Sequence, residues 1–126
     1  MSFESELKTH LGHTSITAYA GDRIYPVVRP QGSALPAIVY TPFAADQVHN
    51  LDGRDGSLRF IRVQIDCWSL TFDEVIAMAA AVTARLDTAA THFRSVLEPG
   101  SGFDDYEPDT KLYRRSMDFR CSFTQT

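Results

Sequence analysis

The chain has 126 residues, a length that fits one domain, and its 44% hydrophobic and 22% charged residues are ordinary for a globular protein. This composition argues against disorder, a collagen-like sequence and a coiled coil. The formal charge of −4 argues against a dedicated nucleic-acid binder, whose affinity would need clustered Lys and Arg on one face.

Two further absences narrow the setting in which the chain is expected to work. No apolar run approaches the roughly 20 residues of a membrane helix, and the segment from Met1 to Glu4 lacks the basic and apolar regions of a signal peptide. We therefore expect a cytoplasmic protein without a membrane partner. The two cysteines, Cys67 and Cys121, are too few and too far apart for a disulfide framework, so we expect two buried free thiols.

The first third of the chain predicts two short helices, a short strand and a long connection. Phe3, Leu7 and Leu11 have helical spacing, and Gly12 is expected to end that helix. A second helical turn is predicted from Ile16 to Tyr19, and a brief strand at residues 24–26. Prolines and a glycine punctuate residues 26–36, which predicts an extended arm or a long loop.

The middle of the chain predicts a β-hairpin. Residues 37–48 are rich in strand-forming residues, although Pro42 indicates an edge position or a bulge. Turn formers follow at residues 49–57. The next strand is the clearest in the sequence, since its residues alternate between an apolar face (Ile61, Val63, Ile65, Cys67) and a second face (Arg62, Gln64, Asp66, Trp68).

A long helix and a second hairpin are predicted for the rest. Helical spacing runs from Phe72 to about Leu86, behind a capping box formed by Thr71 and Glu74. A strand near residues 93–97 precedes a turn-rich segment at 99–110. The last strand, 112–123, alternates apolar residues with Arg114, Ser116, Asp118 and Arg120, and Arg115 interrupts its apolar series. The whole pattern predicts one α+β domain over residues 1–126, with a largely antiparallel or mixed sheet and its helices on one face.

The residues that could perform chemistry do not form a recognisable catalytic or metal site. His10 and His13 share a helix face, but nothing at a suitable spacing completes a metal site, so we expect two surface histidines. His49 and His92 have no local Ser or Cys partner. Phosphate-binding glycine motifs are absent from the sequence. We therefore expect no enzymatic activity, no cofactor and no metal.

The polar faces of the two clearest strands are the first candidate site. A mixed-sign surface of this kind could pair across strands or with another subunit, and the alternative is a solvated sheet face. Aromatic and Arg side chains are enriched at binding hot spots, which favours an interface. The candidate assembly residues are Arg62, Asp66, Trp68, Arg114, Asp118 and Arg120.

Two charged loops are the second candidate. All of the net charge lies in the second half of the chain, and residues 98–110 contain five acids and no Lys or Arg. This segment lacks the ligand pattern of an EF-hand, so the alternatives are a solvated acidic loop, an acidic docking surface and a divalent-metal site. The candidate rim, lumen or docking residues are Asp52, Arg54, Asp55, Glu98, Asp104, Asp105, Glu107 and Asp109.

Several segments, taken in order, resemble the tail-completion, or tail-terminator, family of long-tailed bacteriophages and gene transfer agents. They are Arg23-Ile24-Tyr25-Pro26, Pro30-Gln31-Gly32, Leu35-Pro36-Ala37-Ile38-Val39-Tyr40, His49-Asn50-Leu51-Asp52-Gly53, Arg62-Val63-Gln64-Ile65-Asp66-Cys67-Trp68, Tyr106-Glu107-Pro108 and Tyr113-Arg114-Arg115-Ser116-Met117-Asp118-Phe119-Arg120. The resemblance spans about residues 3–123.

The resemblance implies a non-enzymatic virion protein that forms a ring, typically of six copies, on the end of the completed tail tube. Such a ring stops tube polymerisation and offers a surface to the head. Its implied partners are further copies of itself, the tail tube protein and head–tail connector proteins, with DNA passing through without sequence-specific binding. The implied location is the neck of the virion tail, and the host cytoplasm during assembly. The alternatives are another small head–tail connector, a tail-tube component or a small-molecule-binding α+β domain.

Overall fold

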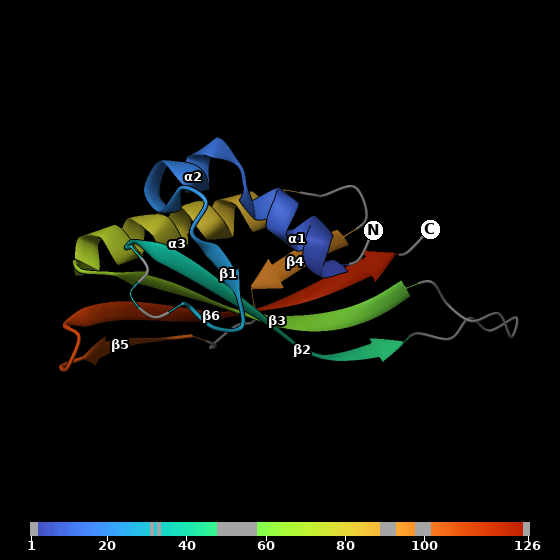
Figure 1. Ribbon diagram of the computed structural model, residues 1–126. Helices are drawn as coiled ribbons and strands as arrows, with labels where there is room; N and C mark the ends of the chain where they lie inside the picture. The colour runs from blue at the N-terminus through green and yellow to red at the C-terminus, as the bar shows by residue number, and fades with distance from the viewer. Residues whose placement is uncertain are drawn as a thin grey trace, which may run out of the picture.

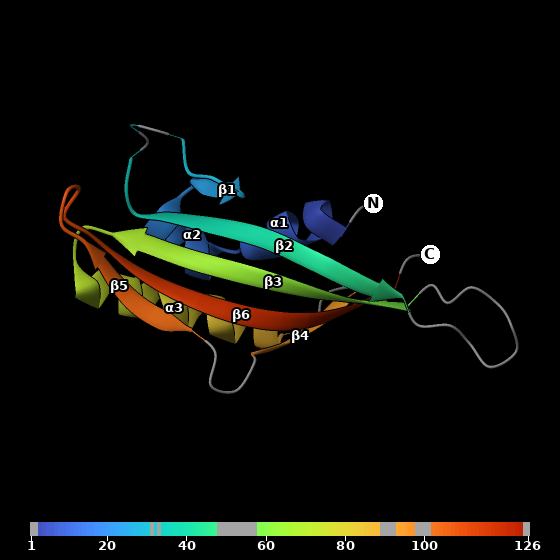
Figure 2. The same cartoon turned by 90° about the horizontal axis from the view of Figure 1, so that it is seen from below.

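The computed structural model describes residues 3–30, 32, 34–47, 58–88, 93–97 and 102–124. Its elements in chain order are α1 (Phe3–Leu11), α2 (Thr14–Ala20), β1 (Ile24–Pro26), β2 (Ala37–Gln47), β3 (Leu58–Ser69), α3 (Phe72–Asp87), β4 (Phe93–Leu97), β5 (Phe103–Glu107) and β6 (Leu112–Thr124). The helices cover one face of a mixed sheet, as Figures 1 and 2 show. The predicted α+β class, with one long and two short helices on one face, is confirmed.

The sheet has the strand order β1-β2-β3-β6-β4, and β5 also pairs with β6. Only β1 and β2 are parallel; every other described pairing is antiparallel. β5 pairs with the first part of β6 (Leu112–Ser116), and β4 pairs with its last part (Phe119–Phe123). Since β3 lies on the other side of β6, β4 and β5 together form one edge of the sheet, and β1 lies at the opposite edge (Figure 2).

The core lies between the helices and the sheet, where the predicted apolar faces meet. Phe3, Leu7 and Leu11 of α1 are almost completely buried. Side chains of a strand alternate between its two faces, and the register pairs the apolar residues of β3 with those of β6. The apolar residues of both strands therefore point to the side of the sheet that the helices cover. The strand residues in this core include Ile38, Tyr40, Ile61, Val63, Ile65, Cys67, Met117, Phe119, Cys121 and Phe123. The predicted periodicities therefore identify the core side of both layers.

The predicted irregularities of β2 and the long connection are also found. The register of β2 against β3 shifts between Pro42 and Ala45, which confirms a bulge near Pro42. The described part of residues 27–36, here called the arm, connects β1 to β2 and projects beyond the β1 edge (Figure 2). The arm is tied at its base, because the Val27 amide donates to the Tyr40 carbonyl at 2.9 Å and the Arg23 Nε donates to the Pro36 carbonyl at 2.8 Å.

The start of α3 follows the predicted capping box only in part. Thr71 is the N-cap, and its hydroxyl accepts a hydrogen bond from the Glu74 amide at 3.3 Å. The carboxylate of Glu74 accepts instead from the hydroxyl of Ser69, whose oxygen is also within 3.4 Å of the Thr71 amide. Ser69 therefore takes the place that the capping box assigns to Glu74.

The prediction of two surface histidines is wrong for His10 and confirmed for His13, and the turn prediction is wrong for residues 103–107. His10 is buried at the C-terminal end of α3, where its Nε2 lies 2.9 Å from the Arg85 carbonyl and 3.1 Å from the Thr88 carbonyl. His13 is exposed and is the N-cap of α2. Residues 103–107 form the strand β5, although the sequence predicted turns throughout 99–110.

Both cysteines are free and buried, as predicted. Burial disfavours the thiolate, which raises the pKa of Cys67 to about 12 and that of Cys121 to about 11. Across the described helices, none combines the length and the hydropathy that crossing a bilayer would require.

Candidate assembly surface

The candidate assembly residues lie on the face of the sheet opposite the helices, here called the outer face. The alternation of β3 and β6 places their polar residues together on this face. The register pairs Arg62 with Arg120, Gln64 with Asp118, Asp66 with Ser116 and Trp68 with Arg114. The structure therefore brings all six predicted assembly residues onto two adjacent strands.

Ion pairs on the outer face are weak and exposed. Arg62 and Asp118 are 3.6 Å apart, and their side chains are 62% and 28% exposed. Such surface pairs contribute about 0–1 kcal/mol. Arg120 lies directly opposite Arg62 and stacks on Phe60, with its guanidinium carbon 4.9 Å from the ring centroid. Because each of these contacts is weak, exchanging them for contacts with a partner protein would cost little internal stabilisation.

Asp66 is the least accessible of the six. It is only 6% exposed, and the Gln64 side-chain amide donates to its two carboxylate oxygens at 3.1 and 3.3 Å. A carboxylate this far from water is retained because it is hydrogen-bonded. Asp66 therefore fixes the Gln64 side chain on the outer face, and it exposes little surface that a partner protein could contact.

The most ordered part of the outer face is a stack of arginines and aromatic rings. The Arg114 guanidinium carbon lies 5.2 Å from the Trp68 ring centroid and 5.1 Å from that of Phe103 on β5. Arg29, from the arm, lies over the same Trp68 ring at 5.8 Å. This stack, Arg29–Trp68–Arg114–Phe103, runs across the outer face from the arm to β5, so it connects the two opposite edges of the sheet.

Arg114 is held more tightly than a surface arginine. It donates to an Asp105 carboxylate oxygen at 3.3 Å, and only 23% of its side chain is exposed. Its Nε is buried, and within the described residues it has no hydrogen-bond partner. A buried donor without a partner costs about 1–3 kcal/mol. Favourable contacts with the flanking rings offset part of this cost.

The acidic segment is largely neutralised by β6. Arg115 donates two hydrogen bonds to the Asp104 carboxylate, at 2.7 and 3.0 Å, as Arg114 does once to Asp105. The hydrogen bond from Arg115 is the main cause that lowers the pKa of Asp104, and the same bond raises the pKa of Arg115. The sequence predicted that these acids lie in a loop without basic neighbours. Instead, the turn at residues 108–111 folds them back onto the arginines of β6. The turn-forming residues before β6 were the sequence feature that could have indicated this hairpin.

The other members of the acidic segment are more open to solvent. Glu107 ends β5 and Asp109 follows in the turn, and both are exposed. The remaining charged-loop residues lie outside the described residues: Asp52, Arg54, Asp55 and Glu98. Their assignment to a rim, lumen or docking loop stays a prediction.

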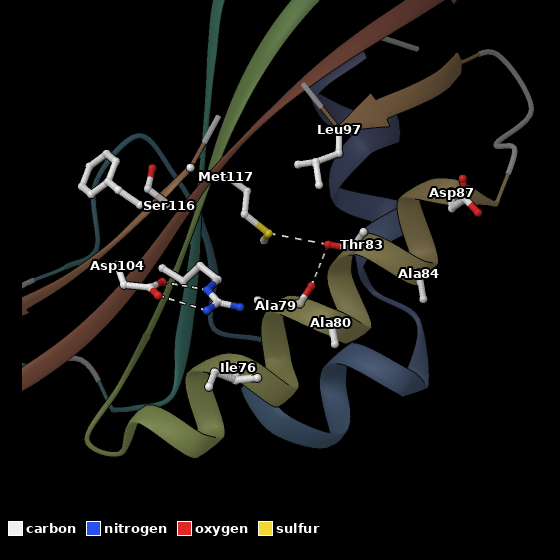
Figure 3. Close-up of a pocket in the computed structure, with 13 residues that line it drawn as sticks. Ile76, Ala79, Ala80, Thr83, Ala84, Asp87, Leu97, Asp104, Ser116 and Met117 are labelled. Atoms are coloured by element: carbon white, nitrogen blue, oxygen red, sulfur yellow. Dashed lines mark hydrogen bonds and ion pairs between the residues drawn. The ribbon is translucent and has the colours of Figure 1, made fainter. Parts of the chain in front are cut away.

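A groove that the sequence did not reveal lies between α3 and the β4–β5 edge. Its volume is about 650 Å³, and Figure 3 shows the residues that line it. Small and apolar side chains form most of the walls, with the Asp104–Arg115 pair and Asp87 as its charged groups. Ile76 is 38% exposed here, and Leu97 is 41% exposed. Among the described residues, no three His, Cys, Asp or Glu side chains are grouped to hold a metal ion.

Comparisons with known proteins identify the family. The family model described as tail completion protein gp17 matches residues 7–124. A chain of the solved structure entitled "Virion of native gene transfer agent (GTA) particle" is similar in fold, with a TM-score of 0.73 at 18% identity over 98% of this chain and 96% of that one. No curated protein matches the chain. The family match covers most of the chain and confirms the predicted resemblance. The chain therefore belongs to the tail completion protein gp17 family and is a structural component of the virion tail.

Proposed function

We propose that the chain assembles as a ring of six copies on the end of the tail tube, where it terminates tube polymerisation and offers the surface that joins tail to head. The observation that carries this proposal is the family match over residues 7–124. The outer face supports it, since a helix-free sheet face with an ordered Arg–aromatic stack is suited to protein contacts.

The size of the domain is compatible with such a ring. A compact chain of this length has a radius of gyration of about 14 Å and a diameter of roughly 36 Å. Six touching spheres of that size, arranged in a hexagon, leave a central hole of about the same width. Duplex DNA would fit through a hole of this width.

The charges of the acidic segment suit such a passage. A lumen rich in Lys and Arg would retain the DNA phosphates by counterion release, whereas a neutral or acidic one lets DNA slide. Glu107 and Asp109, at the end of the β5–β6 hairpin, are exposed. We place this hairpin end at the rim or the lumen of the ring. Its location on the outer circumference, away from tube and head, would contradict this placement.

A tube-growth assay tests the proposed function. Purified tail tube protein is allowed to polymerise, and the chain is added at several concentrations while tube lengths are measured by electron microscopy. A terminator stops elongation at substoichiometric amounts, because only tube ends bind it. Continued elongation with the chain incorporated along the tubes would instead identify a tube component, and elongation without any bound chain would contradict a role at the tube end.

A further inference from the structure

The arm and the groove lie on opposite edges of the same sheet. The arm leaves β1 at one edge, and the groove opens beside β4 and β5 at the other (Figures 2 and 3). Contacts between two different patches of identical chains are head-to-tail, and they close into a ring when the rotation between copies allows it. Two different patches at opposite edges are compatible with such a contact.

The arm exposes apolar side chains without covering them. Val27 and Val28 are 64% and 68% exposed and adjacent in sequence. Val27 has a φ of 65°, a left-handed conformation that costs a β-branched residue about 1–2 kcal/mol. The Val28 amide donates to the Pro26 carbonyl at 2.6 Å and closes a tight turn there. Strained backbone of this kind is typical of binding segments.

The groove has the size and lining to accept such a segment. Its volume of about 650 Å³ lies within the range of sites that bury a whole small ligand, so a short stretch of extended chain fits. On the α3 side, the small side chains of Ala80 and Ala84 leave room for an inserted segment. Ile76 and Leu97 provide exposed apolar surface. The Met117 side chain reaches across the floor toward Thr83, with its sulfur 3.6 Å from the hydroxyl.

The two edges also carry complementary charges. Residues 27–36 contain Arg29 and no acidic residue. Besides the Asp104–Arg115 pair, the groove edge carries three exposed acids, Asp87 at the end of α3, Glu107 at the end of β5 and Asp109 in the turn that follows, and two exposed basic residues, Arg94 on β4 and Lys111 in the same turn. Opposite charges on facing patches orient a contact and disfavour the reversed one, in which like charges would meet.

The open backbone of the two edges does not offer an equally good contact. Pro42 and the bulge after it interrupt the free part of the β2 edge, since proline has no amide hydrogen to donate. Charged side chains also line β5, where Asp104 and Asp105 pair with Arg115 and Arg114 and Glu107 is exposed. Both features are typical of edge strands that avoid pairing with another strand. A side-chain contact between arm and groove is therefore favoured over continuation of the sheet.

We propose that residues 27–30 of one copy insert into the groove between α3 and the β4–β5 edge of the next copy, and that this contact joins neighbouring subunits. The inference rests on the proposed ring and specifies its interface. The Arg29–Trp68–Arg114–Phe103 stack positions both partners of the contact, because Arg29 belongs to the arm and Phe103 lines the groove.

Paired charge substitutions test the contact in the full chain. Val28→Asp changes only the arm and Ala80→Arg only the groove, and both positions are exposed, so folding is not at risk. Each single variant is expected to raise the concentration for half-maximal association about tenfold or more, a factor that corresponds to ~1.4 kcal/mol. The combined variant should regain association, because the introduced carboxylate of one arm then meets the introduced guanidinium in the groove of the neighbour. Thr9→Arg, on the exposed side of α1, is the control and should behave as the unmodified chain.

Mixing the two single variants gives a result that only a head-to-tail contact predicts. The arm of the groove variant remains normal, and so does the groove of the arm variant. These two form the unmodified contact, while the introduced carboxylate and the introduced guanidinium form the compensated one, so the mixture should form rings in which the two variants alternate. Sedimentation velocity compares ring formation by the mixture with that of each variant alone at the same concentration. Association of either variant alone as strong as that of the unmodified chain, or no gain in the mixture or in the combined variant, would overturn the proposal.

Rings on tube ends separate this inference from the proposed function. If the unmodified chain forms rings there and both single variants do so equally well, the arm–groove contact is wrong while the ring stands. If the unmodified chain forms no ring, the proposed function itself fails. If Ala80→Arg abolishes tube binding while Val28→Asp has no effect, the groove binds the tube protein, and the contact between copies is wrong.

Discussion

Arg115 holds Asp104 through two parallel hydrogen bonds, at 2.7 and 3.0 Å, between directly opposed residues of β6 and β5. The guanidinium also lies over the Phe72 ring, 5.9 Å from its centroid, at the start of α3. One side chain therefore connects β5, β6 and α3 at the end of the groove. It also explains why an arginine interrupts the apolar series of β6.

Removing the charge of Asp104 should weaken β5 slightly, in a pH-dependent way. Its pKa is lowered in the folded chain, so the pair stabilises at pH values above the unfolded pKa of about 4 and loses its contribution as pH falls through the folded pKa. Because its side chain is 42% exposed, we expect Asp104→Asn to cost about 0–1 kcal/mol at neutral pH. Urea unfolding at pH 7 and at pH 3 measures this difference. A larger effect at pH 3 would contradict the assignment.

Gly102 should tolerate no side chain at the start of β5. Its φ is 94°, and a Cβ there would approach the Ser116 carbonyl oxygen to 2.7 Å. Gly32 is the matched control, since its φ is 77° but a Cβ would meet nothing within 4 Å. We expect Gly32→Ala to cost about 1–2 kcal/mol from backbone strain alone, and Gly102→Ala to cost more. Equal losses in thermal unfolding would show that the contact with Ser116 is unimportant.

The two thiols should be inert in the folded chain. The thiolate is the reactive form, and burial raises the pKa of Cys67 to about 12 and of Cys121 to about 11. A thiol-specific reagent at pH 8 should therefore modify the native chain slowly and the urea-unfolded chain rapidly. Modification of Cys67 at the same rate in both states would contradict its burial.

Reversing the charge of Arg114 should impair ring formation. Arg114→Glu removes the group between the Trp68 and Phe103 rings and places a carboxylate beside Asp105, so both ends of the stack lose their support. Lys8→Glu is the control, because Lys8 is exposed on α1, on the helix side of the sheet, and takes no part in the stack. We expect Arg114→Glu to raise the concentration needed for association about tenfold. If Arg114→Glu associates as strongly as the control, the stack is exposed to solvent and takes no part in the contact between subunits.

Asp118→Lys tests the neighbouring part of the outer face. The substitution places a third positive charge near Arg62 and Arg120, where Asp118 and Arg62 are 3.6 Å apart. Loss of this exposed pair should change stability by about 0–1 kcal/mol. If this region contacts another protein in the assembly, ring formation should fall much more than stability does. Unchanged assembly, measured by electron microscopy of tube ends, would limit the contact surface to the stack.

The regular elements could be predicted because their residues repeat with the period of the structure. β3 and the second half of β6 alternate strictly, and Val75, Ala79, Val82 and Leu86 of α3 reach the core at helical spacing. β5 could not be found this way. Its two aspartates have low strand propensity, and it forms because Arg114 and Arg115 pair with them across the hairpin.

Of the two candidate surfaces, only the outer face could be predicted from the sequence, because the alternation within each strand identifies its residues. The outer-face residues share one parity on β3 and β6, so their clustering followed from alternation. The groove did not, since its walls come from α3, β4, β5 and β6, which meet only through tertiary packing. His10 was assigned to the surface for the same reason: its partners, the Arg85 and Thr88 carbonyls, are 75 and 78 residues away in the sequence.

Imaging of tube ends tests the central claim most directly. Tubes of purified tail tube protein are incubated with the chain, and the ends are reconstructed by cryo-electron microscopy. The account predicts a single ring of density on one end of each tube, with an open central hole and six copies in the reconstruction. Density spread along the tube wall, or bare ends beside free monomers, would contradict a ring that terminates the tail.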